Sequence, residues 1–120
     1  MSEADTTSVA DADLHVRANF DKITRSYLLS VLSDALIEEH RRKPEGHHSE
    51  PLTRLLNWCQ TRPLHEQYAV LQEAGGCYRV VRLSGKPRVP PARVGSESYA
   101  SLREARHAVF LNHIKDLTGK

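Results

Sequence analysis

A long run of apolar residues at helical spacing constrains the fold of this chain more than any other feature. The residues recur every three or four positions, which is the period of an amphipathic helix. They are Phe20, Ile23, Tyr27, Val31 and Ala35, flanked by Leu28, Leu32 and Leu36. We predict one long helix that starts at Leu14 and ends near Arg41 to Lys43, because Pro44 disfavours helical geometry in the residue before it.

The residues ahead of this helix are small, acidic and without periodicity. Segments of that composition cannot bury enough apolar surface to become ordered alone. We therefore predict that residues 1–13 form a disordered tail unless a partner orders them. Residues 14–120 are then a single small domain, since the whole chain has 120 residues, a common length for one domain.

Two further segments between Pro44 and Leu83 have clear local signals. Pro51 can open a short helix whose apolar face is formed by Leu52, Leu55, Leu56 and Cys59, with Trp58 off that face. Residues 66–71 and 77–83 are strand-like and enclose Gly75-Gly76, which predicts a β-hairpin. Residues 84–95 are rich in proline and glycine, so we expect a turn-rich connection there.

The C-terminal segment is predicted to be a helix that ends at about Leu117. Ser101 and Glu104 have the spacing of a capping box, and Gly119 is a stop signal. The apolar face comprises Leu102, Ala105, Val109, Phe110, Ile114 and Leu117. The expected fold class is therefore α+β, with a long N-terminal helix, a short helix, a β-hairpin and a C-terminal helix in one small domain.

Charge is nearly balanced overall, with 17 Lys+Arg against 15 Asp+Glu, but cations gather in the C-terminal half. Arg79, Arg82, Lys86 and Arg88, together with Tyr68 and Tyr78, could in principle bind nucleic acid through charge and stacking. No nucleic-acid-binding motif accompanies them. Since arginine and tyrosine are also favoured in protein interfaces, we prefer a protein partner and consider nucleic acid unlikely.

Histidines raise the question of a metal site. The densest group is Glu38-Glu39-His40 followed by His47-His48, but it lacks the two-histidine helical spacing of known zinc sites. His107 and His113 are expected on different sides of one helix, as surface or contact residues. We predict no metal ligands on this chain, and favour helix-terminal charge and an interface loop for His40, His47 and His48.

Cys59 and Cys77 form no Cys-x-x-Cys pair, and neither lies in a motif that activates a nucleophile. We predict no disulfide framework, no catalytic residues and two buried apolar cysteines. The N-terminus does not resemble a signal peptide, and no apolar run approaches the roughly 18 residues of a membrane span. The expected location is the cytoplasm, with no membrane partner.

Many weakly specific positions between Glu38 and Asp116 together resemble one known family. They are Glu38-Glu39-His40, Pro44, Gly46, His48, Leu55, Asn57, Pro63, Tyr68, Glu73, Tyr78-Arg79 and, most specifically, EARHAVFLNHIKDL at 104–117. In this order and spacing the chain resembles the small (alpha) subunit of N,N-dimethylformamidase.

The resemblance implies a non-catalytic small subunit that stabilises a large catalytic subunit in a hetero-oligomer. The implied enzyme is an iron-dependent amidohydrolase that hydrolyses N,N-dimethylformamide to dimethylamine and formate. Its iron is expected in the partner large subunit, with no cofactor on this chain. The alternative is a stand-alone basic binding module for nucleic acid or a regulatory protein partner. Candidate residues for the partner interface are His48, Tyr68, Tyr78, Arg79, Arg82, His107 and Phe110.

Overall fold

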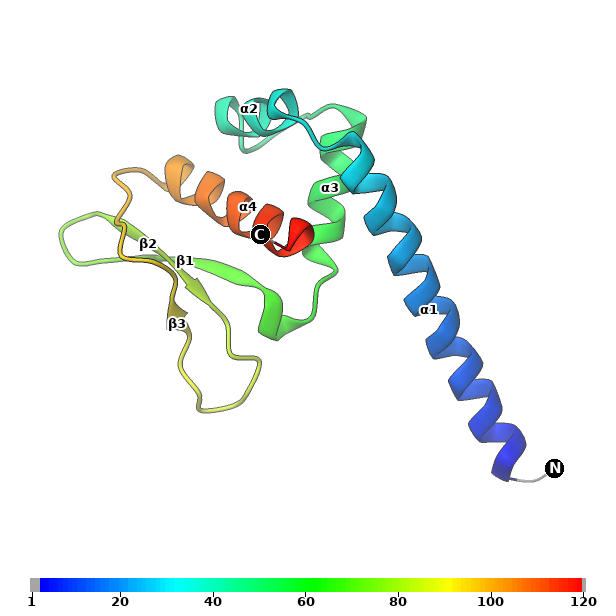
Figure 1. The fold of residues 1–120 in the computed structure, drawn as a ribbon. Coiled ribbons are helices and arrows are strands. Elements are labelled where there is room, and N and C mark those ends of the chain that lie inside the picture. Colours follow the sequence, from blue (N-terminus) through cyan, green and yellow to red (C-terminus); the bar gives the residue numbers. More distant parts are fainter. Residues whose placement is uncertain (1–2, 120) are drawn as a thin grey trace. The chain divides into compact units, whose positions relative to one another are not determined.

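The computed structural model describes residues 3–119 and has an α+β architecture (Figure 1). It divides into two compact units, one that runs to Val31 and one that begins at Leu32. The described α-helices are α1 (Glu3–Val31), α2 (Asp34–Arg42), α3 (Glu50–Gln60) and α4 (Leu102–Thr118), with a short 3-10 helix, η1 (Leu64–Glu66), and the strands are β1 (Tyr68–Gln72), β2 (Tyr78–Arg82) and β3 (Ala92–Arg93). The predicted fold class is confirmed.

The first unit consists of α1. Its apolar stripe includes three side chains that are largely exposed, Val16, Phe20 and Ile23, whereas Tyr27 is 37% exposed. Phe20 alone leaves 71% of its surface open to water. A helix is present where the apolar periodicity predicted one, but it begins at Glu3 and not at the predicted Leu14. The disordered tail predicted for residues 1–13, and the domain boundary that follows it, stay predictions.

The second unit starts with a feature that the apolar periodicity did not reveal. The predicted single helix through residue 41 is wrong, because the chain leaves helical geometry at Ser33 (φ −150°, ψ 163°). The Ser33 hydroxyl then accepts a hydrogen bond from the Leu36 amide at 3.2 Å and caps a new helix, α2. The predicted end near Arg41 to Lys43 is confirmed, since α2 stops at Arg42 ahead of Pro44.

Helix α3 has Pro51 in its first turn and packs against α2. Leu52, Leu55 and Cys59 are buried as the sequence predicted. Trp58 is also buried, with 7% of its surface exposed, so the prediction that it lies off the apolar face is wrong. The Arg62 guanidinium lies 4.3 Å from the centre of the Trp58 ring and helps to cover it.

The predicted hairpin is confirmed and is part of a three-stranded antiparallel sheet in order β1-β2-β3. Tyr68 lies opposite Arg82 at one end of the β1–β2 ladder, and Gln72 opposite Tyr78 at the other. Strand β3 was missed, because it has two residues and lies inside the proline-rich connection. It pairs with the far edge of β2 through Val81–Arg93 and Arg82–Ala92.

Helix α4 is the element around which the second unit is built. It contacts β1, β2 and α2, and Figure 1 shows it lying over the sheet. The Ser101 hydroxyl accepts from the Glu104 amide at 3.1 Å, and Gly119 ends the helix with φ 75°. Most of the predicted face is buried, but Leu102 is 37% exposed. His113 is buried, which corrects its expected surface position.

Candidate functional site

The structure brings three of the predicted interface residues together in one cluster between α2 and α4. We call this the histidine cluster: His40, His48, His107 and Phe110. The Nδ1 atoms of His40 and His107 lie 2.9 Å apart, a hydrogen-bonding distance that requires one ring to donate and the other to accept. The His40 ring stacks on Phe110 with 4.1 Å between ring centres and lies 6.3 Å from the centre of His48.

The surroundings of His40 and His107 favour the uncharged form of both rings. Burial, followed by the nearby charges of His107 and His48, lowers the pKa of His40 to about 4. Burial and the charge of Arg41 lower the pKa of His107, whereas the charge of Glu38 raises it, and the net pKa is lowered. His40 is therefore neutral at pH 7 and is part of the α2–α4 packing. Phe110 is only 2% exposed, so its ring lies in this chain's own core.

The histidine cluster does not form a ligand set. His48 points its Nε2 at the Lys43 carbonyl oxygen, to which it donates at 2.6 Å. Among the residues that the structure describes, no group of three or more His, Cys, Asp and Glu side chains is placed to hold a metal ion. The absence of metal ligands from this chain and the iron expected on a partner subunit both stay predictions.

A second cluster joins Tyr68, Arg82, His113 and Asp116 where the sheet meets the end of α4. Tyr68 Oη donates to Asp116 Oδ2 at 2.7 Å, and the Arg82 guanidinium lies 4.0 Å from the same carboxylate. The His113 ring meets Tyr68 edge to face at 5.0 Å. Burial and the bond to Asp116 raise the pKa of Tyr68 to about 12. Tyr68 is therefore a proton donor within the fold, unsuited to act as a base.

The remaining interface candidates, Tyr78 and Arg79, are half-buried on β2. Tyr78 exchanges backbone hydrogen bonds with Tyr99 at 2.8 and 2.7 Å, which attaches the segment before α4 to the hairpin. The basic strip predicted on the hairpin is partly neutralised, because Arg82 faces Asp116. A role for these residues in binding a partner stays a prediction.

Both cysteines are free thiols. Cys59 is buried as predicted, and burial raises the pKa of its thiol to about 12, which disfavours the nucleophilic thiolate. Cys77 is exposed at the hairpin turn, so the prediction that it is buried is wrong. Neither cysteine lies in a group with a histidine that could activate it among the described contacts.

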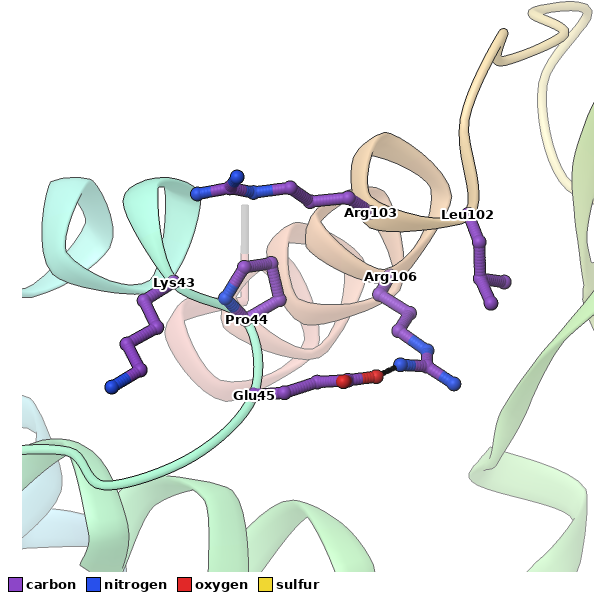
Figure 2. A pocket seen from close by; sticks show the side chains of 6 residues that line it. All are labelled: Lys43, Pro44, Glu45, Leu102, Arg103 and Arg106. Carbon is purple, nitrogen blue, oxygen red and sulfur yellow. Dashed lines mark ion pairs between the residues drawn. The ribbon is translucent and has the colours of Figure 1, made fainter.

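A concave basic surface, which the sequence did not reveal, lies where the end of α2 meets the start of α4. One pocket of about 380 Å³ is lined by Lys43, Pro44, Glu45, Leu102, Arg103 and Arg106 (Figure 2). A second, of about 770 Å³, is lined by Arg41, Arg42, Tyr99, Ser101, Arg103, Glu104, His107, Ala108 and Leu111. Its cations come from segments about 60 residues apart, so only the α2–α4 packing reveals it.

Comparison with known proteins identifies a family that matches most of this chain. The family model described as N,N-dimethylformamidase alpha subunit matches residues 15–120.

The chain belongs to the N,N-dimethylformamidase alpha subunit family.

Two curated relatives agree with this assignment. The chain is 29% identical to the N,N-dimethylformamidase alpha subunit of Paracoccus aminophilus, over 82% of this chain and 72% of the relative. It is 26% identical to the N,N-dimethylformamidase alpha subunit of an Alcaligenes species, over 94% of this chain and 89% of the relative. The resemblance inferred from the sequence is therefore confirmed.

The most specific part of that resemblance, residues 104–117, lies within α4. This helix carries His107 and Phe110 of the histidine cluster together with His113 and Asp116 of the second cluster. The most specific part of the resemblance therefore coincides with the helix that supports the core. None of the helices in the described part combines the length and the apolar character that a membrane-crossing helix needs.

Proposed function

We propose that this chain is the non-catalytic small subunit of a hetero-oligomeric amidohydrolase that converts N,N-dimethylformamide to dimethylamine and formate. The observation that supports the proposal is the family match over residues 15–120. In this proposal the chain docks on a large catalytic subunit and stabilises it in the cytoplasm. The iron belongs to that large subunit, where a Lewis acid would polarise the amide carbonyl.

The chemistry of the described residues supports an accessory role. His40 and His107 bond to each other, Tyr68 bonds to Asp116, and the Cys59 thiol is buried. Each of these groups has a role inside the fold. We therefore assign no step of the hydrolysis to this chain.

The helix α1 supports docking on a partner. Isolated helices are marginally stable in water, and most helical stability in proteins comes from packing of an apolar face. Yet Phe20 and Ile23 are 71% and 59% exposed. A partner subunit that covers such a face would stabilise both chains.

The alternative of a stand-alone nucleic-acid-binding module has less support. Arg82 on the hairpin lies near Asp116, and Arg93 on β3 lies 3.8 Å from Glu73. These carboxylates reduce the positive charge that phosphate binding would need. Lys86 and Arg88 remain exposed, but they are two cations in one loop.

The decisive experiment compares the purified chain, the native large subunit and their complex. Release of dimethylamine from N,N-dimethylformamide and iron content per chain are measured for each. We expect activity and iron in the complex, with neither on the isolated small chain. Hydrolysis by the isolated chain, or one tightly held iron per chain, would overturn the proposal.

A further inference from the structure

The concave surface between α2 and α4 has more cationic than anionic side chains. We define the basic cleft as Arg41, Arg42 and Lys43 at the end of α2 and Arg103 and Arg106 at the start of α4. Its carboxylates are Glu38, Glu45 and Glu104. Cations therefore outnumber carboxylates in one continuous region of the surface.

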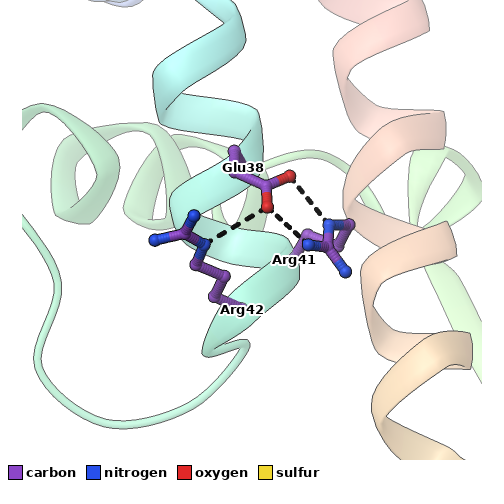
Figure 3. Close-up of polar contacts among 3 residues, drawn as sticks. All are labelled: Glu38, Arg41 and Arg42. Carbon is purple, nitrogen blue, oxygen red and sulfur yellow. Dashed lines mark hydrogen bonds and ion pairs between the residues drawn. The ribbon is translucent and has the colours of Figure 1, made fainter.

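Part of this charge is held in place by local ion pairs. Glu38 accepts from Arg41 Nε at 2.7 Å and from Arg42 Nε at 3.3 Å (Figure 3). Glu45 pairs with Arg106 across the smaller pocket (Figure 2). Both arginines of α2 are exposed, with 59% and 76% of their side chains open to water. Their remaining N–H groups are accessible to a further carboxylate.

Two cations of the basic cleft have no such pair. Among the described residues, neither the Lys43 nor the Arg103 side chain has an ion-pair partner. Arg103 lines both pockets, and Figure 2 shows its guanidinium extending away from Arg106. An arginine that lines a pocket and has no ion-pair partner among the described residues is suited to bind a carboxylate from another molecule, because its planar guanidinium matches that group.

The lining of the larger pocket includes apolar and aromatic side chains as well as charged ones. Tyr99, Ala108 and Leu111 line it together with Arg41, Arg42 and Arg103. Apolar centres with a polar rim, enriched in arginine and tyrosine, are typical of protein interfaces. The surface therefore fits a peptide segment that carries carboxylates together with an apolar side chain.

Other anionic occupants fit less well. A nucleic-acid strand presents phosphates at regular short intervals, and Glu38, Glu45 and Glu104 would repel several of them. A small anion would be held mainly by exposed side chains in an open pocket, where solvent screens the attraction. A folded acidic segment can place its carboxylates beside Lys43 and Arg103 while avoiding the chain's own carboxylates.

We propose that the basic cleft is the surface with which this chain docks an acidic segment of its large partner subunit. This inference rests on the proposed function, because that function supplies the partner. The positive charge accelerates the association by electrostatic steering, and the planar guanidinium groups of the arginines fix the orientation of the docked segment.

The test reverses the two unpaired cations and measures association with the immobilised native large subunit. The cleft variant is Lys43→Glu/Arg103→Glu. Its matched control is Lys86→Glu/Arg88→Glu, which makes the same change of charge at exposed positions of the β2–β3 loop. Association rates are measured at ~50 mM and ~500 mM salt, since surface electrostatics weaken as ionic strength rises.

We expect the cleft variant to associate roughly tenfold or more slowly than the wild type at the lower salt, with a smaller difference at the higher salt. The control should lose much less. An Arg103→Gln variant, which removes a charge without reversing it, should show an intermediate loss. Circular dichroism checks that each variant keeps its helices. If Lys43→Glu/Arg103→Glu does not fold, the association rate of Arg103→Gln decides the test.

The outcomes separate this inference from the proposed function. If the wild type binds the large subunit and the cleft variants bind equally well, the inference is overturned and the proposed function stands. If the wild type does not bind, both are overturned. Tight binding of a single-stranded oligonucleotide near physiological salt, lost in the cleft variant alone, would instead assign the basic cleft to nucleic acid and overturn the inference.

Discussion

His40 is a buried residue whose protonation state is linked to the stability of the fold. It is 3% exposed, and its ring neighbours are His107 and Phe110 on α4 and His48 in the α2–α3 loop, while Glu38 and Arg41 act on the charge of the adjacent His107. The charged groups that act on the pKa of His40 are His107 and His48, and both lower it. A proton added to His40 would therefore be a poorly compensated buried charge.

The pH dependence of stability follows from this environment. Folding lowers the pKa of His40 from 6.5 to about 4, so between these values the unfolded chain binds a proton that the folded chain does not. The free energy of unfolding should thus fall as pH drops through this window, by roughly 3 kcal/mol in total, and level off below it. Urea unfolding at pH 7 and pH 5 measures the first part.

Two variants identify the source of this pH dependence. His40→Phe removes the titrating nitrogens and keeps a ring on Phe110, so the fall between pH 7 and pH 5 should become clearly smaller. His47→Gln, at an exposed position, is the control for loss of a histidine and should behave as the wild type. Equal stability of the wild type at both pH values would show that His40 is not the linked group.

At the scale of elements, α4 provides the apolar face on which the second unit depends. Phe110 is 2% exposed, and its ring stacks on His40 of α2. Leu102 lies on the same helix but is 37% exposed. The two residues therefore form a matched pair for testing which part of the predicted apolar face is core.

Truncation of Phe110 should be far more damaging than truncation of Leu102. We expect Phe110→Ala to lower the free energy of unfolding by about 3–5 kcal/mol, because it removes a buried ring and leaves a cavity. Leu102→Ala should cost under about 1 kcal/mol at its partly exposed position. Circular dichroism during chemical unfolding compares the two, and similar losses would contradict the assignment of Phe110 to the core.

The elements that the sequence predicted well are those with local signals. The hairpin has a Gly-Gly turn between strand-like segments, and α4 has a capping serine and a terminal glycine. The break at Ser33 was missed because apolar spacing continues across it while the decisive cap is one side-chain hydrogen bond. Strand β3 was missed because two residues owe their conformation to pairing with β2.

The candidate sites were predictable only in part, for a related reason. Phe110 and His107 could be placed on one helix from their spacing, but the ring contact to His40 joins segments 67 residues apart. The basic cleft likewise needs the packing of α2 beside α4. Residue type alone did not show that Arg82 faces Asp116, a neighbour in space on a different element.

At the scale of the whole molecule, the two units differ in what stabilises them. The second unit has a core drawn from α2, α3, β2 and α4, with Leu36, Leu52, Leu55, Val80, Phe110 and Leu117 buried. The first unit is a single helix. Stability within a protein varies with local packing, and segments with few buried contacts open at low free-energy cost.

Hydrogen exchange should therefore separate the two units in the free chain. We expect amides of residues 16–27, where Val16, Phe20 and Ile23 are exposed, to exchange much faster than amides of α4. In the complex with the large subunit, a partner that covers the stripe of α1 would slow exchange there, since protection requires suppressed opening of the helix. Peptide-resolved mass spectrometry of the free chain and the complex measures both effects, and α4 provides the internal reference. If residues 16–27 of the free chain were as protected as α4, the exposed stripe would not be a source of local instability. If protection were low in both states, α1 would not be the element that the large subunit stabilises.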